Sequence, residues 1–259
     1  MLMNGIKRVK QTTLRSFKSI YRKYYSENPY FYEYKFDNIA TKSNMNFVNE
    51  LNFVRCHKKS IEYGGRDYCI YLRVHQALWC ASVAQKIEGD FVELGTGRGY
   101  IFAAVSEALK INGIEKAVYL FDTFRPYKTD PVTGAQEDSQ AISKVYADSY
   151  EKVKEKFLEY KDVRVVKGKC PEILSSVYSG DKKRISFLHV DLNYYEAEYS
   201  SLQYLWPYLS PGAIILLDDY SNPGRERQYS THNKFFEEHQ ASVLTLASGQ
   251  GLVIKPFLT

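Results

Sequence analysis

The sequence predicts an α/β protein built on a doubly wound, mostly parallel β-sheet of the Rossmann-like type. Three observations support this fold class. An apolar run, 91–94, leads into glycines at alternate positions and then into a helical pattern over 101–109. Apolar strand patterns alternate with helical patterns over most of the chain, which is typical of parallel sheets. The chain then ends in a hairpin pattern, which predicts an antiparallel edge.

The first part of the chain has no strand–helix alternation. Residues 1–25 are basic and carry apolar residues at helical spacing, and residues 26–41 are aromatic and irregular. Two interpretations of residues 1–25 stay open: peripheral contact with an anionic membrane surface, or a helix packed on its own domain or on a second subunit. We expect a helix over 43–55. We therefore divide the chain into an N-terminal helical and aromatic extension, 1–68, and a main domain, 69–259.

The main domain is expected to begin with a helix over 69–86, before the strand at 91–94. Proline and glycine mark a long loop over 122–140, and proline opens a short helix at 171–178. The remaining patterns predict strands at 117–121, 163–166, 185–190 and 213–217, helices at 141–159, 195–208 and 230–239, and a closing hairpin made of 242–246 and 252–254.

The glycine-rich turn has the pattern E-x-G-x-G-x-G, made by Glu93, Gly95, Gly97 and Gly99. A dinucleotide fingerprint needs G-x-G-x-x-G/A, and Tyr100 or Phe102 stands at its last position here, which disfavours an NAD-dependent oxidoreductase. Glycine lets a ligand approach the backbone, and the helix start offers free N–H groups. The pattern resembles motif I of the class I S-adenosylmethionine (SAM) methyltransferases.

Acidic residues follow the predicted strands. Asp122 ends the second strand, where an acid commonly accepts ribose hydroxyls, and Phe124 could border an adenine. Asp191 and the pair Asp218-Asp219 end two strands that we expect to be neighbours. Three converging carboxylates repel one another, and a hard divalent cation, Mg²⁺ first, relieves that repulsion. The alternative is that Asp191 caps the next helix and Asp218-Asp219 forms a solvated turn.

Several of these segments together resemble the macrocin O-methyltransferase group, over roughly residues 70–255. The segments are 89–95, Phe121-Asp122-Thr123-Phe124, Val190-Asp191 with Tyr195-Glu196, and Pro211-Gly212 through Asp218-Asp219-Tyr220. The resemblance implies a class I methyltransferase fold and SAM-dependent, metal-dependent methylation of sugar hydroxyls. It places SAM near Glu93, the glycines, Asp122, Thr123, Phe124 and Asp191, and a metal on Asp191, Asp218 and Asp219.

The chain departs from that group in places that bear on the acceptor. Arg125-Pro126-Tyr127 replaces the usual E-G-L-P, and Leu192-Asn193-Tyr194 stand where the group often has a glycine and a second acid. Asp191 is one candidate catalytic residue. His232 is the other, as a general base, although it could equally be a surface helix residue. His189, inside a strand, is more typical of a core histidine.

Composition limits the remaining possibilities. The net charge of +5 is too small to indicate a nucleic-acid partner, and the chain lacks an N/D-P-P-Y-type motif. The four cysteines form no C-x-x-C pair, and we find no signal peptide and no transmembrane run, so we expect a cytoplasmic protein. We also expect a homo-oligomer. The expected partner is a glycan, nucleotide sugar or glycosylated small molecule. A catechol-type methyltransferase and a non-catalytic SAM-binding scaffold are the alternatives.

Overall fold

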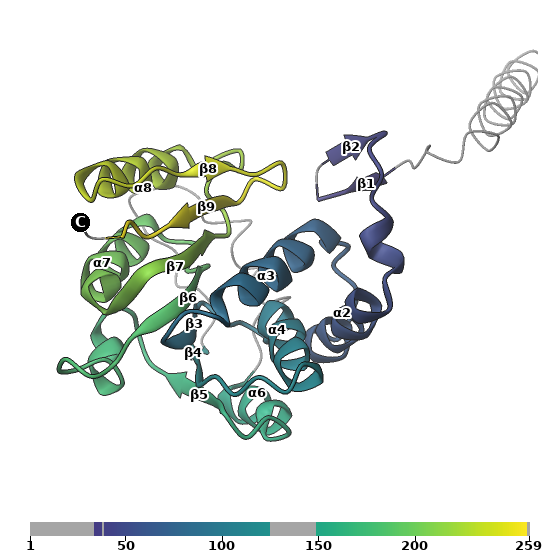
Figure 1. The fold of residues 1–259 in the computed structure, drawn as a ribbon, viewed down its shortest axis with the longest axis horizontal. Helices are drawn as coiled ribbons and strands as arrows, with labels where there is room; N and C mark the ends of the chain where they lie inside the picture. Colours follow the sequence, from purple (N-terminus) through teal and green to yellow (C-terminus); the bar gives the residue numbers. More distant parts are fainter. Residues whose placement is uncertain (1–33, 38, 125–148, 258–259) are drawn as a thin grey trace, which may run out of the picture.

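The computed structural model describes residues 34–37, 39–124 and 149–257. Its centre is a twisted sheet in which five parallel strands are followed by an antiparallel hairpin at one edge (Figure 1). From one edge to the other the strands are β5 (Val163–Lys167), β4 (Val118–Asp122), β3 (Asp90–Leu94), β6 (Ile185–Val190), β7 (Leu209–Leu217), β9 (Gly251–Ile254) and β8 (Leu244–Thr245). The predicted fold class is confirmed.

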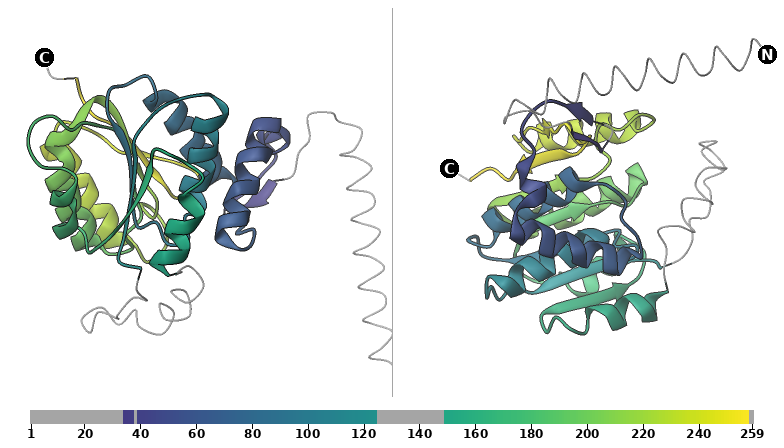
Figure 2. Two further views of the ribbon diagram at one scale, coloured as in Figure 1. Left: turned by 90° about the horizontal axis from the view of Figure 1, so that it is seen from below. Right: turned by 90° about the vertical axis from the view of Figure 1, so that its right-hand side faces the viewer.

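Helices cover both faces of the sheet, as the two views in Figure 2 show. One face carries α2 (Leu51–Gly64), α3 (Tyr71–Ala84), α4 (Tyr100–Ile111) and α6 (Tyr150–Phe157). The other face carries the 3-10 helix η2 (Glu172–Ser176), α7 (Tyr195–Leu205) and α8 (Glu226–Glu238), and a 3-10 turn, η3 (Trp206–Tyr208), leads into β7.

Alternation along the strands separates the two cores. In β3, Phe91 packs with the α2–α4 core, whereas Val92 and Leu94 pack with the α7–α8 core. Successive strand residues point to opposite faces, and parallel strands buried on both faces therefore read as continuous apolar runs. This is why the strand predictions were accurate at the centre of the sheet.

The segment before α3 packs on the main domain. A short antiparallel pair, β1 (Tyr34–Phe36) and β2 (Ile39–Thr41), leads to a 3-10 turn, η1 (Asn46–Asn49), and then to α2. Phe53, Cys56 and Tyr63 of α2 are buried in the same core as α4. The helix expected at 43–55 was therefore placed too early, because Glu50 adopts an extended backbone and α2 begins after it.

Other boundaries also differ from the predictions. β7 begins at Leu209, not at 213, because Leu209 already pairs with Ile185 of β6; the ladder then has a register shift, and Gly212 in this part of β7 has φ +78°. α8 begins at Glu226, four residues before the expected start, and β8 has only two residues. The segments 1–33 and 125–148, which contain the basic N-terminus, most of the predicted loop at 122–140 and the first half of the helix at 141–159, lie outside the described residues.

Candidate active site at the carboxyl ends of the strands

The glycine-rich turn joins β3 to α4. Gly95 and Gly99 have φ of +90° and +87°, a region that favours glycine, and Gly99 stands at the N-cap of α4. A Cβ on Gly95 would lie 2.5 Å from the carbonyl carbon of Asp191 and closer still to its oxygen. The turn therefore packs directly on the end of β6, next to Asp191. Asp191 is the first of the three acids Asp191, Asp218 and Asp219, which form the acid set.

Asp122 lies beside this turn, at the end of β4. Its Oδ2 accepts a hydrogen bond from the backbone N–H of Gly97 at 2.7 Å, and its Oδ1 accepts one from that of Phe124 at 2.6 Å. Burial raises the pKa of the Asp122 carboxyl, and these two N–H donors oppose the rise. Thr123 and Phe124 follow directly, so the predicted cofactor-binding segment 122–124 begins next to Gly97.

Glu93 does not face the open cleft. It is 2% exposed, and its Oε1 lies 3.1 Å from Nδ1 of the fully buried His189 in the neighbouring strand β6. Burial lowers the pKa of His189, but Asp218 and Glu93 outweigh it and raise that pKa to about 10. A cationic His189 therefore lies between the acid of the glycine motif and an acid at the end of β7.

Asp218 is the most strongly held of the three acids. Its Oδ2 is paired with Arg73 of α3, its Oδ1 accepts from Gln250 Nε2 at 2.7 Å, and His189 Nε2 lies 3.6 Å from that same oxygen. Burial would raise the pKa of Asp218, but Arg73 and His189 hold it below its ordinary value. Asp218 is therefore a carboxylate at neutral pH.

Asp191 and Asp219 complete the set. Asp191 Oδ1 accepts from Asn193 Nδ2 at 3.1 Å, and Asp219 lies 3.1 Å from Arg225 and 3.6 Å from Arg73. Burial raises the pKa of Asp191 well above its usual range, and the neighbouring Asp218 and Asp219 raise it further. The predicted convergence of these three acids is therefore present, and two arginines take up part of their charge.

The donor set has the chemistry that Mg²⁺ prefers, because it offers carboxylate oxygens on adjacent strand ends. As the side chains lie, however, no group of three or more acidic, histidine or cysteine residues within 34–37, 39–124 and 149–257 is arranged around one ion. Arg73 occupies the space between Asp218 and Asp219 instead. A cation held by these oxygens would have to take the place of the Arg73 guanidinium.

His232 lies apart from the other predicted catalytic residue. It is 1% exposed within α8, its Nε2 lies 3.1 Å from Glu198 Oε2, and its ring stacks at 6.4 Å on Tyr220. It is therefore neither the surface residue considered as an alternative nor directly exposed to the acid set. Its role as a general base stays a prediction that this burial disfavours.

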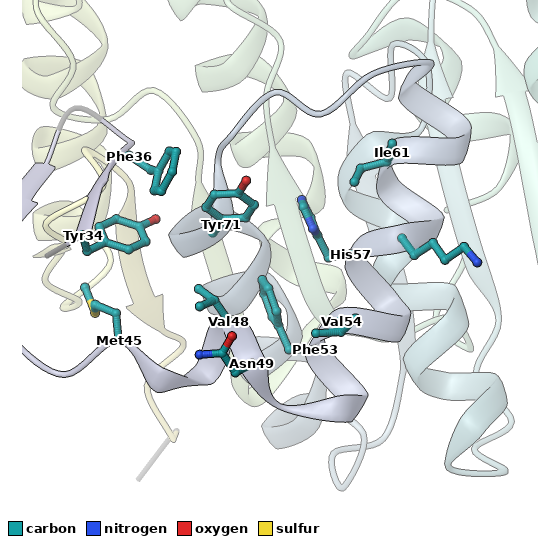
Figure 3. A pocket seen from close by; sticks show the side chains of 11 residues that line it. Tyr34, Phe36, Met45, Val48, Asn49, Phe53, Val54, His57, Ile61 and Tyr71 are labelled. Atoms are coloured by element: carbon teal, nitrogen blue, oxygen red, sulfur yellow. The ribbon is translucent and has the colours of Figure 1, made fainter. Parts of the chain in front are cut away.

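A separate pocket of about 510 Å³ lies at the N-terminal side of the molecule, between β1, η1, α2 and α3 (Figure 3). Tyr71 lines it, whereas Arg73, two residues later on α3, reaches Asp218. Residues two apart on a helix point in nearly opposite directions. Tyr71 and Arg73 therefore point to different sides of α3, the first toward the pocket and the second toward Asp218.

Comparison with known proteins agrees with this arrangement. A family model described as macrocin O-methyltransferase (TylF) matches residues 72–242, which is most of the chain and includes the glycine turn and all three acids. The chain belongs to the macrocin O-methyltransferase family. The resemblance stated from the sequence is confirmed.

Individual proteins that resemble this chain have low sequence identity to it. A curated relative from Streptomyces olivaceus, 8-demethyl-8-(2,3-dimethoxy-alpha-L-rhamnosyl)-tetracenomycin-C 4'-O-methyltransferase, is 29% identical over 153 residues, which are 54% of this chain and 56% of the relative. The chain thus spans about half the length of that curated relative.

Two solved structures share the fold. The O-methyltransferase NovP is 20% identical with a TM-score of 0.62 and covers 77% of this chain and 88% of its own. The calicheamicin methyltransferase CalS11 is 14% identical with a TM-score of 0.55 and covers 79% and 93%.

Sequence reasoning missed three residues that this macrocin O-methyltransferase-family chain brings to the site. Arg73 comes from α3, Arg225 from the loop before α8, and Glu198 from α7, where it accepts hydrogen bonds from the backbone after Asp191. Arg225 had a signal, because it is a basic residue only six positions after Asp219 in the sequence. Arg73 had none, since it stands in an ordinary amphipathic helix.

Within the described part of the chain, no helix is long and apolar enough to cross a membrane.

Proposed function

We propose that the protein is a SAM-dependent O-methyltransferase that methylates a sugar hydroxyl of a glycan, nucleotide sugar or glycosylated small molecule. The observation that carries the proposal is the packing of Gly95 on Asp191, which brings the glycine turn and the acid set to one edge of the sheet. The family supports methyl transfer to oxygen. The name of the curated relative, a 4'-O-methyltransferase of a rhamnosyl-bearing tetracenomycin, supports a sugar acceptor.

In the cofactor half of the site, we propose that SAM lies against the backbone of the turn at Gly97, whereas Gly95 and Gly99 let the turn pack on Asp191 and Phe157. Asp122 still has lone pairs on both oxygens beyond its bonds to Gly97 and Phe124, and they can accept the ribose hydroxyls. We propose that Thr123 and Phe124 border the adenosine. Glu93 contributes indirectly, by holding His189 behind the turn.

In the acceptor half, Asp191, Asp218 and Asp219 would hold Mg²⁺. When bound, the cation supplies a Lewis acid that takes neighbouring sugar oxygens and favours ionisation of one of them. Asp191 adjoins the glycine turn, so as a carboxylate it is placed to orient the hydroxyl and to accept its proton. The hydroxyl oxygen then bonds to the methyl carbon as the carbon–sulfur bond breaks, and S-adenosylhomocysteine leaves.

Positioning is most of what the chain has to supply. The sulfonium already activates the methyl group, so the protein's contribution is the in-line approach of one oxygen, which can be worth about 7–11 kcal/mol. The fixed position of Asp218, held by Arg73, Gln250 and His189, serves this need.

The test uses methyl-deuterated SAM with three pools: nucleotide sugars, neutral glycosides, and catechols. Each pool is incubated with Mg²⁺ and, separately, with a chelator, and products are read by mass spectrometry. Label in a sugar product that needs Mg²⁺ supports the proposal in full. Label in catechols alone would replace the sugar acceptor by a phenol. Tight binding of S-adenosylhomocysteine with no labelled product in any pool would favour a non-catalytic SAM-binding protein.

The homo-oligomeric state expected from the sequence stays a prediction, and sedimentation of the intact chain tests it.

A further inference from the structure

We propose that Glu198 and His232 are positioning residues for Asp191, which they hold through the turn between β6 and α7. The inference rests on the proposed function, in which Asp191 is the acid that handles the acceptor hydroxyl. It gives His232 a role that needs no contact with the acceptor. It also assigns a function to a buried acid, Glu198, that the family resemblance does not mark.

Glu198 binds the backbone that directly follows Asp191. The side chain comes from the first turn of α7 and is 2% exposed. Its Oε1 accepts hydrogen bonds from the backbone N–H of Leu192 at 3.2 Å and of Asn193 at 3.0 Å. Two consecutive peptide groups are thus fixed by one carboxylate, and bonds to a charged acceptor are stronger than neutral ones.

Residues of α8 make this buried carboxylate stable. His232 Nε2 lies 3.1 Å from Glu198 Oε2, and Gln228 Nε2 donates to both carboxylate oxygens at 3.3 Å. A buried carboxylate without partners is costly. Gln228 therefore holds Glu198 by hydrogen bonds, whereas His232 holds it by close contact, since its ring nitrogens have no hydrogen-bond partner within the described residues. Both side chains dock α8 on α7 at this point.

The conformation of the turn determines the orientation of the Asp191 side chain through Asn193. Asn193 has φ +59°, a left-handed conformation that asparagine tolerates, and its Nδ2 donates to Asp191 Oδ1 at 3.1 Å. Arg225 donates to the Asn193 carbonyl at 3.2 Å and to its Oδ1 at 2.6 Å. If the peptide groups at 192–193 were released, Asn193 would lose its orientation, and Asp191 would lose its only hydrogen-bond donor found within the described residues.

A displacement of about 1 Å at a reacting group can lower the rate about a hundredfold, even when its cause lies away from the chemistry. Loss of the Glu198 contacts should therefore appear in kcat. It should not appear in cofactor affinity, because none of these contacts involves the glycine turn or Asp122.

The first experiment compares Glu198→Gln with Glu198→Leu. Glutamine keeps an amide oxygen that can accept from both backbone N–H groups and places its NH₂ beside His232, whereas leucine removes the acceptor. We expect Glu198→Gln to keep kcat within about threefold and Glu198→Leu to lower it about 10–100-fold, both with S-adenosylhomocysteine affinity within about threefold of the wild type. Ser201→Ala is the control, since Ser201 is buried on the same helix and its hydroxyl has no partner within the described residues.

The second experiment separates positioning from general-base catalysis. His232→Gln retains a donor toward Glu198 but cannot act as a base near neutral pH, whereas His232→Leu retains neither property. If His232 is a positioning residue, His232→Gln should keep most of the kcat that His232→Leu loses. The loss of kcat caused by His232→Leu should also be smaller when Glu198 is already replaced by glutamine than in the otherwise wild-type protein. An equally deep loss of kcat in His232→Gln and His232→Leu would overturn the proposal in favour of a base.

A third readout needs no turnover, so it separates failure of this inference from failure of the proposed function. Amide exchange of the segment 191–195 should be faster in Glu198→Leu than in the wild type, with the segment 91–99 unchanged. If exchange at 191–195 stays at the wild-type rate, Glu198 does not hold the turn, whatever the acceptor proves to be.

Discussion

Gly95 lies against the backbone of Asp191, so that even a methyl group at Gly95 would overlap the Asp191 carbonyl. The two residues end adjacent parallel strands, β3 and β6, whose ladder pairs Leu94 with Val190. The two strand ends are therefore in contact through their backbones, whereas the side chain of Asp191 is oriented by Asn193 in the turn that follows. In the proposed function, this contact brings the methyl group of a cofactor held by the turn next to Asp191.

Gly95→Ala should damage both halves of the site. Alanine at φ +90° is strained by about 1–2 kcal/mol, and its Cβ must also displace the Asp191 backbone. We expect at least a tenfold loss of S-adenosylhomocysteine affinity by calorimetry, on the order of 1.4 kcal/mol or more. Gly113→Ala is the matched control: its φ is +64° and no atom lies within 4 Å of the added Cβ, so it should lose stability without losing affinity. Equal affinities in the two variants would remove Gly95 from the site.

Asp122→Asn should weaken cofactor binding by about 10–100-fold, because the amide turns one acceptor into a donor that faces the Gly97 or Phe124 N–H. The expected loss is in affinity for SAM and S-adenosylhomocysteine, with kcat at saturating SAM little changed. Calorimetry measures the first and initial rates the second. A variant that binds as tightly as the wild type would show that Asp122 holds only the turn.

Arg73→Ala should destabilise the protein and increase its response to divalent cations. Removing one partner of a buried ion pair costs about 3–5 kcal/mol, since Asp218 is left charged and buried. Arg73 lies between Asp218 and Asp219, so its removal also vacates space that Mg²⁺ can take. The rise in melting temperature on adding Mg²⁺ should be larger in Arg73→Ala than in the wild type. The same rise in both would contradict competition between Arg73 and the cation.

The protonated state of His189 predicts how stability depends on pH in the presence of a chelator. Its pKa is raised from 6.5 to about 10, so the folded state binds a proton that the unfolded state releases above pH 6.5. The stabilisation is fully present below about pH 6.5 and is lost as the pH rises through about 10. The stability difference between wild type and His189→Asn, measured by denaturant unfolding, should shrink over that window. A difference independent of pH would mean that His189 is neutral.

Much of the fold could be predicted from the sequence because local patterns encode it. The buried strands are continuous apolar runs, and the glycines at 95, 97 and 99 mark a turn in which all three have positive φ. The positions of the acids followed from topology, since parallel strands present their carboxyl ends at one edge. Helix starts were less accurate, as at α2, where the extended Glu50 delays the helix.

The counterions of the acid set could not be predicted in the same way. Arg73 reaches Asp218 across 145 positions of sequence, and His232 pairs with Glu198 through the packing of α8 on α7. Such contacts depend on which face of a helix meets the sheet and on how far a side chain extends. A sequence pattern predicts the amphipathic face of a helix, but it does not predict which residue a given polar side chain of that helix will pair with.

The most direct test of the central claim uses Asp191→Asn with the acceptor identified from the labelled pools. Gly95, Asp122 and Asp191 are proposed to form one site with a cofactor half and an acceptor half. We therefore expect S-adenosylhomocysteine affinity within about threefold of the wild type and transfer of the methyl group reduced at least about 1,000-fold, as for removal of a group that acts on the reacting atoms. Methylation of the acceptor by Asp191→Asn at the wild-type rate would contradict the account.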